Sequence, residues 1–166
     1  MTLAKPVVWN VGIILACSVL MGALIVRKIE SIPRAVAPPE PGERIKGSSA
    51  LAFQSSRKTI LLLTASTCHF CSESMPFYRR VSSAVRPHGT RMIGLSWEPV
   101  ERNAAYLSSH GVEVDGVISA AQTSLTVHAT PTLLLVDHEG RVLKVWSGRL
   151  DEASEAEVLT AADGTN

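Results

Sequence analysis

Hydrophobic and polar positions divide this chain into three stretches of different character. From Pro6 to Val26 no residue is charged, and most side chains are aliphatic. A helix of roughly 20 such residues, rising about 1.5 Å per residue, matches the ~30 Å hydrocarbon core of a bilayer. We therefore predict a transmembrane anchor over residues 1–30 that contacts lipid through residues 6–26. A cleaved signal peptide is the alternative, because Ala35-Val36-Ala37 resembles a cleavage site.

Residues 31–47 form the second stretch, which holds four of the nine prolines and shows no apolar periodicity. Proline-rich segments of this kind are semi-extended and relatively stiff. We predict that this stretch is a spacer, which holds the following domain away from the membrane surface.

The third stretch, residues 48–166, alternates short apolar runs with segments of helical periodicity. Runs rich in aliphatic and β-branched residues predict strands at residues 59–65, 91–97, 132–136 and 142–146. Apolar spacing and end signals predict helices from residue 68 to about 85, from Pro99 to Gly111, and from a cap at Asp151 to near Gly164. The order β-α-β-α-β-β-α indicates an α/β domain with parallel strands, helices on both faces and an antiparallel edge.

Charge and cysteine content narrow the classes of function. The chain carries 16 basic and 15 acidic side chains, a net charge of +1, and this balance gives no electrostatic argument for nucleic-acid binding. Of three cysteines, Cys17 lies in the apolar stretch, so Cys68 and Cys71 are the pair available to the domain. Two cysteines three positions apart cannot hold a whole fold together, which excludes a disulfide-rich scaffold.

The segment Cys68-His69-Phe70-Cys71 lies where a predicted strand gives way to a predicted helix. This spacing within a first helical turn allows the two sulfurs to form a small disulfide ring. The free amides and the positive dipole end of that turn stabilise a thiolate at Cys68. His69, when protonated, acts in the same direction. Cys71, one turn deeper, would then resolve a mixed disulfide between Cys68 and a substrate.

Beyond this pair, the chain resembles the thioredoxin superfamily over about residues 50–166. Pro76 follows Cys71 by five residues, as the helix-kinking proline of that family does. The segment from Ala129 to Leu135 is similar to the family's cis-proline segment and the strand after it. The resemblance implies a thioredoxin-like three-layer sandwich, a central mixed β-sheet flanked by helices, preceded here by one transmembrane helix. It also implies that Pro131 packs against the cysteines and that Thr130 aligns an extended substrate.

The N-terminal anchor and the CxxCxxxMP pattern are most similar to bacterial membrane-tethered thioredoxin-like reductases. This likeness implies thiol:disulfide exchange on protein substrates, as a reductase more than an oxidant, with no cofactor and with electrons from a membrane donor protein. His69 and Phe70 occupy the place of the Gly-Pro found in strongly reducing members. Leu62 stands where typical thioredoxins have a buried aspartate, so Glu73, through a water, is our candidate proton acceptor for Cys71.

The location of the domain rests on two opposed arguments. Lys5 precedes the apolar stretch, whereas Arg27, Lys28 and Arg34 follow it, and this count alone favours a cytoplasmic domain. A tethered redox domain gains most, however, on the side of the membrane where disulfides persist. We predict a single-pass protein of the inner membrane with its redox domain on the periplasmic side, and the charge pattern leaves the orientation open.

Two other functions fit the same residues. Two thiolates and an imidazole from Cys68, Cys71 and His128 would suit copper, as in a thioredoxin-fold copper chaperone, although such chaperones have CxxxC spacing. A redox-inactive binding module, in which the disulfide is only structural, is the other alternative. Half a zinc site at Cys68 and Cys71 is a weaker alternative, because the sequence has no second closely spaced pair of ligands.

Overall fold

The computed structural model of this protein describes residues 17–24, 37–47 and 49–163. The chain divides into two compact units, residues 1–34 and residues 35–166. In the first unit residues 17–24 are helical. Among the described residues no helix is both long and apolar enough to cross a bilayer. Most of the predicted span over residues 6–26 lies outside the described residues.

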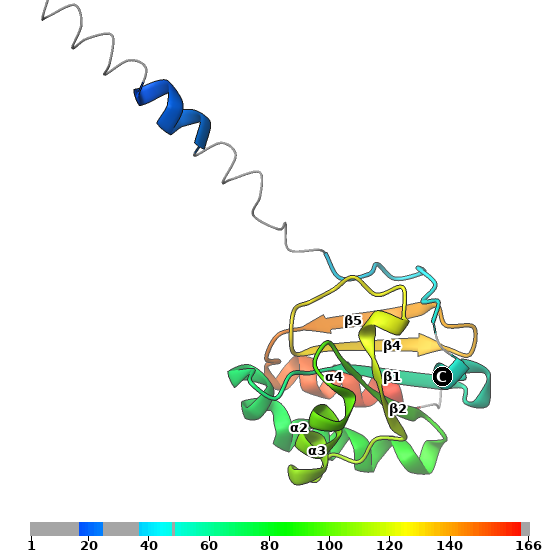
Figure 1. The fold of residues 1–166 in the computed structure, drawn as a ribbon. Helices are drawn as coiled ribbons and strands as arrows, with labels where there is room; N and C mark the ends of the chain where they lie inside the picture. Colours follow the sequence, from blue (N-terminus) through cyan, green and yellow to red (C-terminus); the bar gives the residue numbers. More distant parts are fainter. Residues whose placement is uncertain (1–16, 25–36, 48, 164–166) are drawn as a thin grey trace, which may run out of the picture. The chain divides into compact units, whose positions relative to one another are not determined.

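A mixed β-sheet forms the centre of the second unit, and its strands lie in the order β3-β2-β1-β4-β5 (Figure 1). The strands are β1 (Lys58–Leu63), β2 (Arg91–Ser96), β3 (Gly116–Ser119), β4 (Thr132–Asp137) and β5 (Val142–Ser147). β1, β2 and β3 are parallel, whereas β4 runs antiparallel to both β1 and β5. The four predicted strands are thus confirmed, and the antiparallel edge with them. β3 was not predicted and adds a fifth strand at the other edge of the sheet.

Three α-helices of the second unit lie close to their predicted positions: α2 (His69–Val85), α3 (Val100–Ser109) and α4 (Glu152–Ala162). The predicted cap of α4 is confirmed, because the Asp151 carboxylate accepts a hydrogen bond of 2.8 Å from the Ser154 amide. Short 3-10 turns complete the described elements: η1 (Ser49–Leu51), η2 (Phe53–Ser55), η3 (Arg86–His88) and η4 (Ala120–Gln122).

The prediction of helices on both faces of the sheet is wrong for the described residues. All three α-helices pack on one face, where Met75, Leu107 and Val158 meet Ile60 and Leu62 of β1. The reason is the strand order. The steps from β1 to β2 and from β2 to β3 go the same way across the sheet, so right-handed crossovers place α2 and α3 on the same face.

The second face of the sheet is covered by loops and 3-10 turns instead of α-helices. Leu61 and Leu63 of β1 pack there in a cluster that includes Leu51 of η1 and Ala120 of η4. The same cluster takes in Ile45, which is only 4% exposed. The core of the unit is therefore divided by the sheet into a helical side and a loop side.

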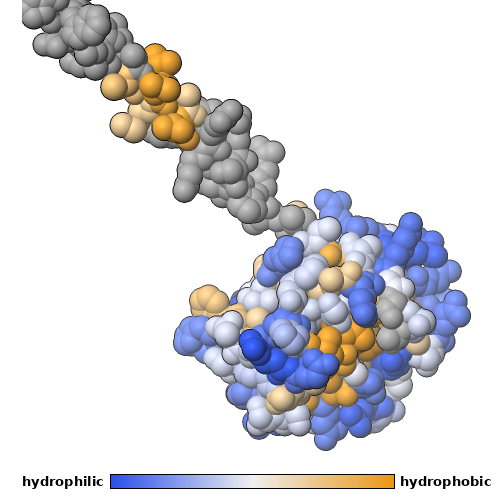
Figure 2. Space-filling view, in the orientation of Figure 1, coloured by the Kyte–Doolittle hydropathy of each residue, from blue (hydrophilic) through white to orange (hydrophobic). Residues whose placement is uncertain are grey.

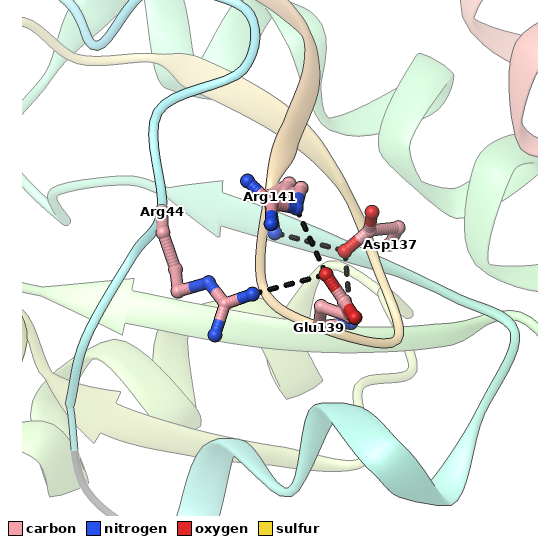
Figure 3. Close-up of polar contacts among 4 residues, drawn as sticks. All are labelled: Arg44, Asp137, Glu139 and Arg141. Atoms are coloured by element: carbon pink, nitrogen blue, oxygen red, sulfur yellow. Dashed lines mark hydrogen bonds and ion pairs between the residues drawn. The ribbon is translucent and has the colours of Figure 1, made fainter.

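Residues 42–47, predicted as the end of a free spacer, are part of the folded unit. The Gly42 amide donates to the Val142 carbonyl at 2.7 Å, and the Ile45 amide donates to the Gly140 carbonyl at 2.8 Å. Figure 3 shows the side chains at this contact, where Arg44 and Arg141 both donate to the Glu139 carboxylate, at 3.0 and 2.8 Å. The buried side chain of Ile45 explains the attachment, since its burial removes an aliphatic group from water.

Candidate functional site

The two cysteines of the CxxC segment lie at the start of α2, as predicted. Cys68 is the N-cap residue of this helix, and its Sγ accepts a hydrogen bond of 3.2 Å from the Cys71 amide. The turn before it is closed by a bond of 3.1 Å from the Cys68 amide to the Ala65 carbonyl. A sulfur in the N-cap position takes the place of the usual side-chain oxygen and receives the amide that the helix leaves free.

The environments of the two sulfurs differ, and their pKa values shift in opposite directions. Partial burial opposes ionisation of Cys68, but hydrogen bonds from the Cys71 thiol, the Thr130 side chain and the amides of Cys71 and Phe70 outweigh it. The net effect lowers the pKa of Cys68. Burial, with further contributions from the hydrogen bond to Cys68 and its charge, raises the pKa of Cys71 to about 12. At neutral pH the half-exposed sulfur is therefore the better nucleophile and the buried one keeps its proton.

A loop distant in sequence completes the immediate surroundings of Cys68. The peptide bond between Thr130 and Pro131 is cis, and the Cys68 thiol donates to the Thr130 carbonyl across 3.4 Å. Pro131 is buried, and its carbonyl accepts a hydrogen bond of 2.8 Å from the Gly148 amide. The structure thus brings together the cysteine pair and the proline segment that the sequence analysis assigned to one site.

The remaining predicted site residues lie on the solvent side of α2. Phe70 is 54% exposed, and the rings of His69 and Phe70 are 5.7 Å apart. Glu73 pairs with His69 at 3.1 Å through one carboxylate oxygen and with Arg149 at 3.0 Å through the other. Since both oxygens are engaged at the surface, the role of Glu73 as proton acceptor for Cys71 stays a prediction.

A polar network behind the cysteine loop was missed in the sequence analysis. The Glu98 carboxylate accepts hydrogen bonds from the Ser66 amide at 2.8 Å and the Ser66 hydroxyl at 2.7 Å. The buried amide group of Asn103 donates to Glu98 and to the Thr64 carbonyl. These hydrogen bonds with Ser66 and Asn103 outweigh desolvation and lower the pKa of Glu98.

One signal in the sequence could have identified Glu98. It lies two residues after the end of β2, and the cysteine loop follows β1 at the same edge of the parallel strands. Polar side chains at the carboxyl ends of neighbouring parallel strands are brought together by that geometry. Asn103, in contrast, lies within a helical pattern whose polar positions are mostly exposed, so its burial could not be read from the sequence.

Comparisons with known proteins identify the fold. Neither protein-family models nor curated protein sequences match this chain. Solved structures do. A thioredoxin-family thiol:disulfide interchange protein from Chlorobium tepidum superimposes with a TM-score of 0.55 and 18% identity, covering 77% of this chain and 100% of that one. A thiol-disulfide isomerase from Corynebacterium glutamicum superimposes with a TM-score of 0.54 and 16% sequence identity, covering 78% of this chain and 94% of that one.

The protein has a thioredoxin-like fold. Peroxidoxin BcpB from Mycobacterium tuberculosis is also similar to it, with a TM-score of 0.53 and 17% identity over 69% of this chain and 83% of that one. Proteins of different activity therefore share this architecture at such identities. What the thioredoxin-like domain does must be argued from its own site.

Copper binding by the alternative site would require His128 to lie beside Cys68 and Cys71, but the His128 ring contacts Trp97 instead. This ring stacks on Trp97 with the centroids 4.2 Å apart, and the Trp97 indole donates to the Val127 carbonyl at 2.9 Å. Within the part of the chain that the structure describes, no three His, Cys, Asp or Glu side chains are grouped closely enough to hold a metal ion. The alternative copper site of Cys68, Cys71 and His128 is therefore not formed.

Proposed function

We propose that this protein carries out thiol:disulfide exchange on protein substrates, with Cys68 as the attacking and Cys71 as the resolving residue. One observation carries the proposal: the two thiols differ in access and in acidity, although they are only three residues apart. Cys68 is half-buried with a lowered pKa, whereas Cys71 is buried with a pKa raised to about 12. A structural disulfide has no need of such a difference, but a two-step exchange uses it.

The exchange has two balanced steps. First the Cys68 thiolate attacks a substrate disulfide, and a bond forms between Cys68 and one substrate sulfur. The other substrate sulfur leaves with the electron pair of the broken disulfide bond and takes up a proton. Cys71 then loses its proton and attacks the Cys68 sulfur, which closes the Cys68–Cys71 disulfide and releases the second substrate thiol. The substrate gains two electrons, and no cofactor or metal is needed. A membrane electron-donor protein would return the pair to the dithiol form.

Reduction of substrates is the direction that the high pKa of Cys71 supports. The nucleophilicity of a thiolate rises with its pKa. A thiol with a raised pKa, such as Cys71, also favours the closed disulfide over the open dithiolate. Closure of the disulfide is the step that completes substrate reduction. Thr130, with its carbonyl next to Cys68, and Pro131 would align an extended substrate chain beside the attacking sulfur. Phe70, exposed next to the pair, would contribute apolar contact to that chain.

We further propose that residues 1–30 anchor the domain in the inner membrane, with the domain on the periplasmic side. Support comes from the uncharged run over residues 6–26 and from helix 17–24, whose Val19, Leu20 and Leu24 are more than 60% exposed and form an apolar surface (Figure 2). Protease added to spheroplasts of an expressing bacterium tests the orientation. Digestion of the domain agrees with a periplasmic location, and protection of the domain in intact spheroplasts contradicts it.

The reduction potential of the full chain, equilibrated in glutathione or dithiothreitol buffers, tests the proposed reaction. We expect a reversible two-electron couple that is lost in Cys68→Ser and in Cys71→Ser. Known CxxC proteins range from about −270 mV for reductants to about −120 mV for oxidants, and we expect a value in the reducing half. A pair that cannot be reduced in these buffers would contradict exchange and favour the redox-inactive binding module. Such a module would also keep its partner after Cys68→Ser.

A further inference from the structure

The hydroxyl group of Tyr106 is a buried polar atom that the exchange described above does not use. It has no hydrogen-bond partner among the described residues. A buried hydroxyl without a partner is unfavourable, and such groups are uncommon in folded proteins. The ring itself is well held, since it packs against the helical-side core cluster and makes an edge contact with His110 at 4.6 Å between centroids.

Tyr106 lies on the face of α3 that packs against the cluster containing Cys71. Asn103, one turn earlier on α3, bonds to Thr64, which follows β1 and precedes the cysteine loop. Tyr106 is three residues further along the helix and so lies on the same face. Helical side chains lean toward the N-terminus of their helix, and here that direction leads back toward the cysteine loop. Cys71 belongs to the helical-side core cluster, and both Cys68 and Tyr106 pack against that cluster.

Cys71 carries a buried negative charge at one point of the cycle. To resolve a mixed disulfide it must ionise while buried at 0% exposure, among apolar side chains such as Leu62 and Met75. Neither of these two side chains can donate a hydrogen bond to the thiolate. The Ala65 backbone and the Thr130 side chain already favour that thiolate, but burial still raises the pKa of Cys71 to about 12. A further donated hydrogen bond would therefore lower the cost of the resolving step.

We propose that the Tyr106 hydroxyl donates a hydrogen bond to the Cys71 thiolate that forms while the mixed disulfide is being resolved, a role that rests on the proposed function. Tyr106 transfers no proton in this step. The Cys71 proton passes to solvent or to the departing substrate sulfur, and the bond between Cys71 and Cys68 forms as the substrate bond breaks. Tyr106 is thus a positioning and stabilising donor, whose hydroxyl gains a partner only in the resolving state.

Two further observations agree with this role. Burial, and then the charges of Cys71, Cys68 and Glu98, raise the pKa of Tyr106, so the phenol keeps its proton when Cys71 ionises. The other tyrosine near the pair, Tyr78, already has a hydrogen-bond partner in the Ser74 side chain. Of these two phenols, Tyr106 is therefore the one with a free donor.

The experiment compares Tyr106→Phe with Tyr78→Phe in the reduced full chain, using dithiobis(nitrobenzoate) as the substrate disulfide. All proteins, the wild-type reference included, carry Cys17→Ser, because this exposed thiol would also release thionitrobenzoate. Attack by Cys68 releases one thionitrobenzoate, and resolution by Cys71 releases the second, so stopped-flow absorbance separates the two steps. We expect Tyr106→Phe to leave the first release within about twofold of wild type and to slow the second about tenfold or more. Its thermal midpoint should not fall, because the deleted hydroxyl has no partner to lose.

The matched control Tyr78→Phe deletes a hydroxyl that has a partner. It should lower the thermal midpoint and leave the second release within about twofold of wild type. A normal second release in Tyr106→Phe would overturn the role of Tyr106, and so would equal slowing of both releases. A wild-type protein that releases no second thionitrobenzoate would contradict the proposed function itself, which keeps the two failures distinguishable.

Discussion

The Cys68 sulfur lies 3.4 Å from the carbonyl oxygen of Thr130, a residue 62 positions later in the chain. This contact exists only while Cys68 is a thiol, because a thiolate has no proton to donate to a carbonyl. When Cys68 ionises, the Thr130 carbonyl is released, while the Thr130 side chain still favours the thiolate. Thr130 therefore binds the Cys68 thiol through its carbonyl and stabilises the Cys68 thiolate through its side chain.

Thr130→Val should raise the pKa of Cys68. Valine keeps the shape and the carbonyl of Thr130 but removes the side-chain hydrogen bond that favours the Cys68 thiolate. We expect iodoacetamide to alkylate Cys68 about two- to fivefold more slowly at pH 6, with the midpoint of the pH profile moved upward. Thr126→Val, an exposed change in the same loop, is the control and should leave the profile unchanged. Identical profiles for the two variants would contradict this assignment.

Burial of Cys71 predicts a specific dependence of stability on pH in the reduced protein. Its pKa is about 12 in the folded chain and about 8.5 when unfolded, so the folded state binds the proton more tightly. This contribution is fully present below about pH 8.5 and is lost as the pH rises toward 12. Wild type should lose about 1–2 kcal/mol more than Cys71→Ala between pH 8 and pH 10, in urea unfolding curves. Parallel loss in both proteins would refute the raised pKa.

Glu98→Ala should destabilise the loop that leads into Cys68. The change leaves the amide and hydroxyl of Ser66 without their acceptor, and the Asn103 side chain loses one of its partners. We expect the free energy of unfolding to fall by about 1–3 kcal/mol and the alkylation rate of Cys68 to change with it. Glu101→Ala, an exposed change in the first turn of α3, should lower the free energy of unfolding by only a few tenths of a kcal/mol. Equal effects of the two substitutions would mean that the network does not support the loop.

The strands, the α2 helix and the cysteine site could be predicted from the sequence because each has a strong local signal. The run TILLLT predicts a buried strand, and the spacing of Met75, Tyr78 and Val81 predicts the helix that follows it. The CxxC and Pro131 could be assigned to one site only through their resemblance to a known fold. Their contact, 3.4 Å across 62 residues, is not encoded in any local pattern.

Other features depend on tertiary structure that no local pattern records. β3 has the short sequence GVIS and lies at an edge of the sheet, half-exposed, so its signal is weak. The placement of all three α-helices on one face follows from the strand order, which the alternation of elements did not specify. Ile45 stands between Arg44 and Lys46, and only the fold reveals that its side chain is buried. The hydrogen-bond partners of Glu98 likewise become visible only in the fold.

Ile45→Ala distinguishes a free spacer from a segment that is part of the domain. Ile45 is 4% exposed in the cluster on the loop side of the sheet, and its amide bonds to the Gly140 carbonyl. Deleting its buried side chain should lower the free energy of unfolding of the full chain by about 2–4 kcal/mol, since it leaves a cavity against β4 and β5. Leu143→Ala, which truncates an aliphatic side chain that is 39% exposed on β5, should cost less than about 1 kcal/mol. If Ile45→Ala changes the unfolding free energy by no more than Leu143→Ala, residues 42–47 do not stabilise the domain, and the folded unit begins only at η1.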